Sequence, residues 1–155
     1  MNGTPRPPQT TAHALLIDCY GRFLFVRRAT GTWGLPAMAL TFDLSPYNQT
    51  IDFIRQRLGI EAREQDLILA HVTAHSSDLA HGGIGLVISV GFWTGEPVPA
   101  PDPATLPARR WCAPGHPPVP LGAWDGAVMP SLMTTSVYTE IGWTNLPVTP
   151  PDPPD

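Results

Sequence analysis

Five short stretches of the chain carry the apolar patterns that are typical of β-strands. The first two, residues 12–18 and 22–28, are joined by Cys19-Tyr20-Gly21, in which glycine permits a positive φ angle, so they predict a hairpin. The other three stretches are residues 67–75, 85–93 and 108–112.

Two of these strands also carry information about burial. Residues 85–93 are almost wholly apolar, which predicts a central strand that is covered on both faces. Residues 67–75 alternate, and strict alternation places on one face Leu69, His71, Thr73 and His75.

A helix is predicted over about residues 46–58. Ser45-Pro46 is a typical N-cap followed by proline in the first turn, and Leu58-Gly59 is a typical end. The apolar stripe at helical spacing consists of Tyr47, Ile51, Ile54 and Leu58. A weaker helix, interrupted by Pro130, is predicted over residues 121–135. Strands alternating with one or two helices indicate a layered α/β or α+β domain.

Composition narrows the class of protein. The chain has 155 residues, enough for one domain, and a formal charge of −4 with nine Arg and no Lys, so nucleic acid is not expected as a partner. No apolar run reaches the length of a membrane span, and no secretory signal is visible. Cys19 and Cys112 lie far apart and suggest no disulfide framework. These features predict a cytoplasmic protein without membrane association.

Proline sets the expected boundaries, because it cannot occupy helix interiors or central strands. The chain has 20 prolines, many of them near the C-terminus. We expect an N-terminal tail over residues 1–10, a folded domain over 11–144 and a Pro-rich disordered tail over 145–155.

Trp33-Gly34-Leu35-Pro36, followed 23 residues later by Gly59-Ile60, resembles the Nudix hydrolase superfamily. In that family a Trp-x-Leu-Pro entry precedes the Nudix box, a loop and helix that carry glutamates and end in glycine plus an apolar residue. The pattern is similar from the first predicted strand to Leu121. The resemblance implies a Nudix-fold α/β/α sandwich with a mixed β-sheet.

Laid onto this chain, the box spans residues 38–60 and has lost nearly every carboxylate. Met38 stands in place of the family's glycine and Leu44 in place of its first Glu. Asp52-Phe53 replaces the Arg-Glu pair, and Gln56-Arg57 replaces the Glu-Glu pair. Mg²⁺ prefers oxygen ligands, which Leu, Phe and Arg do not supply. We therefore expect neither a metal nor another cofactor at the box.

The substituted positions are candidate ligand-binding residues. Met38, Leu44 and Phe53 would form an apolar pocket, or else fill a collapsed site as core. Gln56 offers a neutral oxygen, and Arg57 can pair with a carboxylate or phosphate through its planar fork, or simply end the helix in solvent.

The candidate catalytic residues are His71, His75 and Asp78. They belong to the densest group of titratable side chains, and histidine suits proton transfer near neutral pH. A polar hairpin end at the surface is the ordinary structural explanation. Along a strand His71 and His75 are too far apart to share one metal ion.

Three functions remain open at this point. The first is a metal-independent enzyme, of isomerase, cyclase or hydratase type, acting on a small, mostly apolar metabolite. The second is a non-catalytic ligand-binding or regulatory domain. The third is residual Nudix diphosphate hydrolysis with Mg²⁺ on Asp43, Asp52 and Glu61, whose spacing does not reproduce the box. The expected partner is a small-molecule ligand, and a homodimer is left open.

Overall fold

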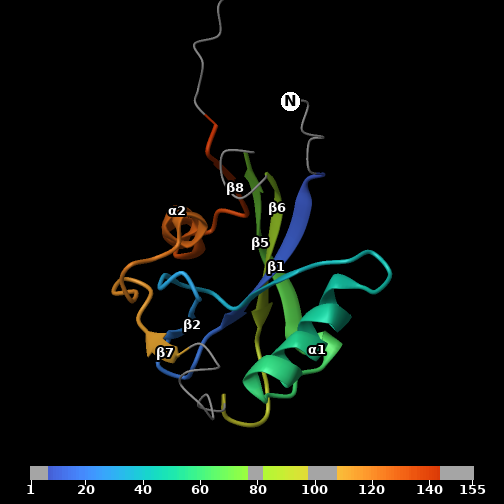
Figure 1. Cartoon of the computed structure of the whole chain (residues 1–155). Coiled ribbons are helices and arrows are strands. Elements are labelled where there is room, and N and C mark those ends of the chain that lie inside the picture. The colour runs from blue at the N-terminus through green and yellow to red at the C-terminus, as the bar shows by residue number, and fades with distance from the viewer. Residues whose placement is uncertain (1–6, 77–81, 98–107, 144–155) are drawn as a thin grey trace, which may run out of the picture.

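The computed structural model describes residues 7–76, 82–97 and 108–143. A five-stranded sheet forms its centre, with α1 on one side and α2 on the other, and a second, three-stranded sheet lies beside it (Figure 1). In chain order the elements are β1 (Gln9–Leu16), β2 (Phe23–Arg27), β3 (Trp33–Gly34), β4 (Ala37–Ala39), α1 (Pro46–Leu58), the 3-10 helix η1 (Glu64–Asp66), β5 (Leu67–His75), β6 (Gly83–Val90), β7 (Arg109–Cys112), α2 (Ala123–Leu132) and β8 (Tyr138–Ile141).

The large sheet has the strand order β4-β1-β6-β5-β8. β1 runs parallel to β6 and β5 parallel to β8, whereas the β1–β4 and β5–β6 pairs are antiparallel. The sheet is therefore mixed, as expected, and the apolar strand β6 lies at its centre, although it begins and ends earlier than the sequence predicts. The small sheet has the order β3-β2-β7.

The predicted hairpin between the first two strands forms only at its turn. Ile17 bridges Phe23, and the Asp18 N–H donates to the Arg22 carbonyl at 3.0 Å. Beyond the turn the strands separate, β1 into the large sheet and β2 into the small one. The prediction of two strands is confirmed, but their pairing along the whole length is wrong, because β1 pairs with β4 and β6 whereas β2 pairs with β3 and β7.

Alternation along the strands divides the interior into two cores. On the α1 side, sheet residues such as Leu16, Ile88 and Val90 pack with Ile54 and Leu58 of α1. On the α2 side, the core group consists of Leu15, Phe23, Phe25, Trp33, Leu35, Val87 and Met129. A side chain on one face of the large sheet is therefore separated from the other face by the sheet itself.

A β-bulge in β5 changes the predicted pattern of faces. The pairing with β6 shifts between Leu69 and His71, so that Leu69 lies opposite Ile88 while His71 lies opposite Val87. The extra residue moves Leu69 to the α1 side and leaves His71 on the α2 side. The prediction that both share one face is wrong, since strict alternation assumes an uninterrupted ladder.

Helix α1 has the bounds that its cap signals predict. The Ser45 Oγ accepts the Asn48 N–H at 3.1 Å, and Gly59 ends the helix with φ 70°, a left-handed conformation that favours glycine. Ile54 and Leu58 are fully buried, while Tyr47 and Ile51 are half-buried against the same core. The predicted stripe does pack on the sheet.

Helix α2 is shorter than predicted and tolerates Pro130 in its last turn. The carboxylate of Asp125 is buried and binds the Arg28 Nη1 at 2.7 Å and the Leu35 N–H at 2.9 Å. A Cβ on Gly34 would lie 2.4 Å from this carboxylate, so β3 needs glycine here. Neither described helix is long and apolar enough to cross a membrane.

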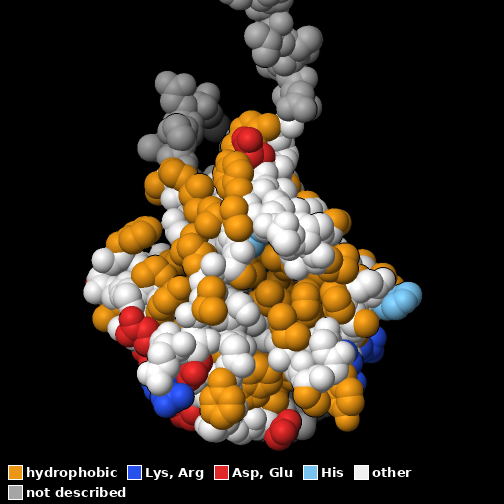
Figure 2. All heavy atoms as spheres, turned by 180° about the vertical axis from the view of Figure 1, so that it is seen from behind, with side chains coloured by type: hydrophobic (Ala, Val, Ile, Leu, Met, Phe, Trp, Pro, Cys, Tyr) orange, Lys and Arg blue, Asp and Glu red, His pale blue; other side chains and the backbone are white. Residues whose placement is uncertain are grey.

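The strand β8 covers only the second half of β5, opposite Val72 to His75. The uncovered half leaves Ile68 and Leu69 66% and 45% exposed, and Tyr138 of β8 is 50% exposed. In the view from behind, hydrophobic side chains spread over the middle of the surface, and most of the charged ones lie toward its margins (Figure 2). The face seen in Figure 2 therefore presents much apolar surface.

Candidate functional site

The substituted box positions lie along α1 and the chain that leads to it. Met38 on β4 and Phe53 on α1 are both half-buried and pack against the α1-side core. Leu44, in the loop before the helix, is 54% exposed, and Gln56 and Arg57 are exposed at the helix end. The structure thus brings Met38 and Phe53 to one core and leaves the other three at the surface.

The buried side chain of Gln49 forms hydrogen bonds that hold the loop before α1. Its Nε2 donates to the carbonyls of Thr41 and Leu44 at 2.7 and 2.8 Å, and its Oε1 accepts the Thr41 N–H at 3.0 Å. Three hydrogen bonds hold the loop where a metal-binding box would have its first glutamate. The loop conformation is therefore maintained by protein atoms.

The residues present do not fit the Mg²⁺ ion that the Nudix fold implies. Asp52, the remaining carboxylate among the substituted box positions, pairs with Arg55, and Arg57 would repel a cation. Within the described ranges, no three His, Cys, Asp or Glu side chains lie close enough together to hold a metal ion. The box positions therefore lack the oxygen ligands that Mg²⁺ prefers.

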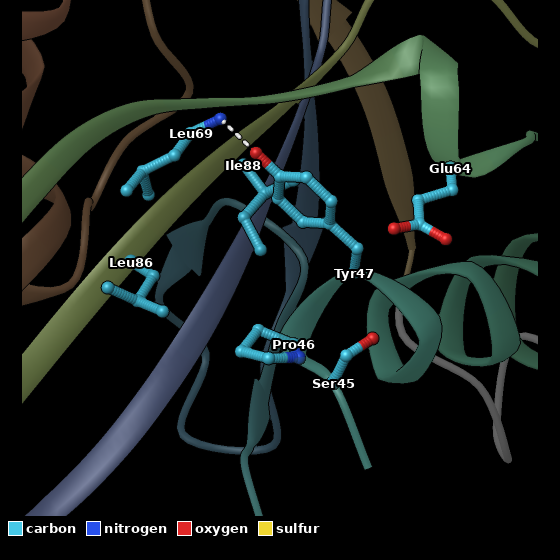
Figure 3. Close-up of a pocket in the computed structure, with 7 residues that line it drawn as sticks. All are labelled: Ser45, Pro46, Tyr47, Glu64, Leu69, Leu86 and Ile88. Atoms are coloured by element: carbon cyan, nitrogen blue, oxygen red, sulfur yellow. Dashed lines mark hydrogen bonds between the residues drawn. The ribbon is translucent and has the colours of Figure 1, made fainter.

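An apolar groove lies at the beginning of α1, directly after Leu44 (Figure 3). Its volume is about 260 Å³. The lining residues come from the helix N-terminus, η1 and strands β5 and β6, and they are Ser45, Pro46, Tyr47, Glu64, Leu69, Leu86 and Ile88. An apolar cavity of about 150 Å³ accommodates benzene, so this groove has room for a ring with a short side chain.

Three polar groups reach this apolar groove. The Tyr47 hydroxyl accepts the Leu69 N–H at 2.9 Å, so its own O–H proton remains available to a ligand (Figure 3). The carboxylate of Glu64 points toward the Tyr47 ring from the opposite side, and the Ser45 hydroxyl lies at the helix cap. The sequence pattern indicated only packing for Tyr47 and gave no signal for Glu64, because the fold brings η1 to α1.

His71 is buried and holds β8 against β5. Its Nδ1 lies 2.9 Å from the Ser136 carbonyl and its Nε2 lies 2.8 Å from the Thr139 Oγ1. Both ring nitrogens are thus occupied by protein atoms, which is the arrangement of a structural histidine. A catalytic role for His71 stays a prediction that this geometry does not favour.

His75 is half-buried at the end of β5, and its Nδ1 has no hydrogen-bond partner among the described residues. Burial lowers the pKa of its imidazole, which favours the neutral form. Asp78, the third candidate, lies outside the described residues. His75 is therefore the one predicted catalytic side chain, among those described, whose ring retains an unoccupied nitrogen.

The described candidate catalytic residues and the half-buried ligand-binding candidates lie on opposite faces of the large sheet. His71 and His75 lie on the α2 side, level with Val87 and Gly83, whereas Met38 and Phe53 pack on the α1 side. The apolar groove also opens on the α1 side. His71 and His75 therefore do not share a site with Met38 and Phe53.

His13 was missed by the sequence analysis. It is buried on the α2 side of β1 and stacks on Trp124 with ring centroids 3.6 Å apart, while the Trp124 Nε1 donates to the Thr73 Oγ1 at 3.0 Å. Burial, with smaller effects of Arg28 and His75, lowers the pKa of His13 to about 3. A histidine inside an apolar run was the available signal, and it indicates a neutral core residue.

The element order, with its capped helix between β4 and β5 and its mixed sheet, defines a Nudix-fold domain. Among solved structures, a MutT Nudix hydrolase from Burkholderia pseudomallei superposes with TM-score 0.66 at 24% identity, covering 83% of this chain and all of that one. A MutT protein from Bacillus halodurans gives TM-score 0.65 at 14% identity, covering 85% and 88%. An ADP-ribose pyrophosphatase from Streptococcus suis gives 0.54 at 15%, covering 86% and 98%.

At these identities the likeness is one of fold, and it confirms the predicted Nudix fold. No protein family model matches the sequence. No curated protein matches it either.

Proposed function

We propose that this chain is a Nudix-fold protein that binds a small, mostly apolar molecule without a divalent metal. The observation that carries the proposal is the donor set of the box, where Leu, Phe and Arg stand in place of carboxylates. The apolar groove at the beginning of α1 supports it. Fold alone does not establish activity, so the site has to decide it. Concave apolar sites with a few polar groups are the usual form of small-molecule sites.

Binding without catalysis is the version that the geometry supports best. The candidate histidines face away from the groove, and both nitrogens of His71 are occupied. General acid–base catalysis requires the acid or base to reach the reacting proton within hydrogen-bond distance. We therefore prefer a non-catalytic ligand-binding or regulatory role to the enzyme hypothesis.

Metal titration and hydrolysis assays test the metal-free part of the proposal. Calorimetric titration with Mg²⁺ or Mn²⁺ should show binding no tighter than that of an ordinary carboxylate surface. Incubation with ADP-ribose or nucleoside triphosphates and Mg²⁺ should release no product. A stoichiometric micromolar metal site, or hydrolysis that EDTA abolishes, would show that residual Nudix chemistry persists.

A metal-independent enzyme of isomerase, cyclase or hydratase type is the second candidate, and the unoccupied Nδ1 of His75 favours it. In that case His75 would act on the α2 side rather than in the groove, and Asp78 stays a predicted partner that lies outside the described residues. His75→Gln should then abolish turnover of a substrate without affecting ligands that bind on the α1 side.

A further inference from the structure

The groove at the beginning of α1 combines an apolar floor with an acidic rim. Leu86 and Ile88 of β6 and Leu69 of β5 line it beside the Tyr47 ring, so an occupant must offer a hydrophobic body. Glu64 also lines the groove, and Figure 3 shows its carboxylate on the other side of the Tyr47 ring from Leu86 and Ile88. The groove therefore distinguishes one end of a ligand from the other.

The local charge at this rim is negative. The segment that leads to β5 carries three acidic residues, Glu61, Glu64 and Asp66, against the single basic Arg63. Arg63 is engaged by Asp66, with its Nε 3.2 Å from the Oδ2. No ion pair of Glu64 is present within the described ranges, so its charge is left for a ligand.

We propose that this groove binds a small primary amine whose apolar body lies on Leu69, Leu86 and Ile88 and whose ammonium group pairs with Glu64. The inference rests on the proposed metal-free binding function and names its ligand class. The carboxylate repels the diphosphates that a metal-loaded Nudix box would hold, because like charges at the rim disfavour an anion. The Tyr47 O–H provides a donor for an oxygen or π-face in the middle of the ligand.

Three compounds of similar shape and different charge test the assignment: 2-phenylethylamine, 2-phenylethanol and phenylacetate. Binding is followed by amide chemical shifts, with the Leu69 N–H, which donates to Tyr47, as the reporter in the groove. We expect the amine to bind about fivefold more tightly than the alcohol, the scale of one solvent-accessible ion pair, and phenylacetate most weakly. The preference should weaken in 1 M salt.

Two carboxylate variants distinguish a direct ion pair with Glu64 from the general negative charge of the segment. Glu64→Gln should reduce the preference for amine over alcohol to about one, while binding of the alcohol stays within twofold. Glu61→Gln is the matched control, since Glu61 is exposed in the same segment and does not line the groove. A preference that both variants reduce equally would overturn the pairing with Glu64.

Leu69→Trp fills the groove from an exposed position and should abolish binding of both the amine and the alcohol. Equal binding of amine and alcohol to the wild type in the groove would overturn the amine assignment and leave the apolar-ligand function standing. Failure of all three compounds to shift the Leu69 amide resonance would overturn both the amine assignment and the apolar-ligand function. A concentration-dependent dimer that Leu69→Trp dissociates would instead make a second copy of this chain the occupant, which also contradicts the proposal.

Discussion

The role of a buried histidine in this molecule depends on whether its ring nitrogens have hydrogen-bond partners. His71 is held at both ring nitrogens, whereas His13 has a buried Nδ1 without a partner among the described residues. Phe53 stands at a box position and packs on the core only in part. These differences lead to separate predictions for His13 and Phe53.

Protonation of His13 should make the protein acid-sensitive. Its pKa is about 3 in the folded state against 6.5 in the unfolded chain, so the unfolded state takes up the proton first as pH falls. Stability is therefore full above about pH 6.5 and decreases toward pH 3, by about 2 kcal/mol at pH 5.

Urea unfolding at pH 7.5 and pH 5.0 measures this loss. His13→Phe keeps an aromatic ring against Trp124 but cannot titrate, so it should lose much less stability over the same interval. His116→Gln, at an exposed position, is the control and should behave like the wild type. An equal acid loss in His13→Phe would contradict the assignment.

Truncation of Phe53 distinguishes a ligand-facing ring from core. Because its side chain is half-buried, Phe53→Ala should cost about 2 kcal/mol, below the range of about 3–5 kcal/mol for a fully buried phenylalanine. Leu58→Ala, fully buried on the same helix, is the comparison, and chemical denaturation measures both. A loss in the full core range would remove Phe53 from the candidate ligand-binding residues.

At the scale of elements, one partly buried ion pair connects α2 with the chain that enters the box. Asp125 of α2 binds Arg28 and the Leu35 N–H. Asp125→Ala should destabilise by about 3 kcal/mol, because it leaves a partly buried Arg28 and a buried amide without their partner.

A double-mutant cycle measures this connection. Arg28→Ala and Asp125→Ala together should cost less than the sum of the single variants, by roughly 1–3 kcal/mol. The exposed Arg55–Asp52 pair is the control, and its coupling should stay below about 0.5 kcal/mol. Additive losses for Arg28 and Asp125 would show that α2 is held by its apolar contacts alone.

At the scale of the whole molecule, the expected boundaries can be tested by truncation. Residues 145–155 include five prolines and little apolar surface, so their removal should leave the melting temperature nearly unchanged. Thermal unfolding of the shortened chain measures this. A decrease of several degrees would show that the segment contributes to the folded domain.

The sequence by itself determined the elements whose signals are local. Ser45-Pro46 and Gly59 set the ends of α1, and the apolar run within β6 identified the central strand, because caps and burial patterns act within a few residues. The loss of the box carboxylates could also be inferred from the sequence, since it concerns residue types rather than positions in space. The strands β3, β4 and β8 were missed. β3 has only two residues, and β4 and β8 form through pairing with strands that are distant in the sequence.

Only the tertiary structure decided which of the candidate residues share a site. A single bulge in β5 places Leu69 on the α1 side, and the sheet separates the groove from His71 and His75. The sequence cannot show this, because one extra residue in a strand reverses the face of all that follow. Glu64 begins the 3-10 helix η1, and its proximity to Tyr47 depends on how η1 packs rather than on spacing along the chain.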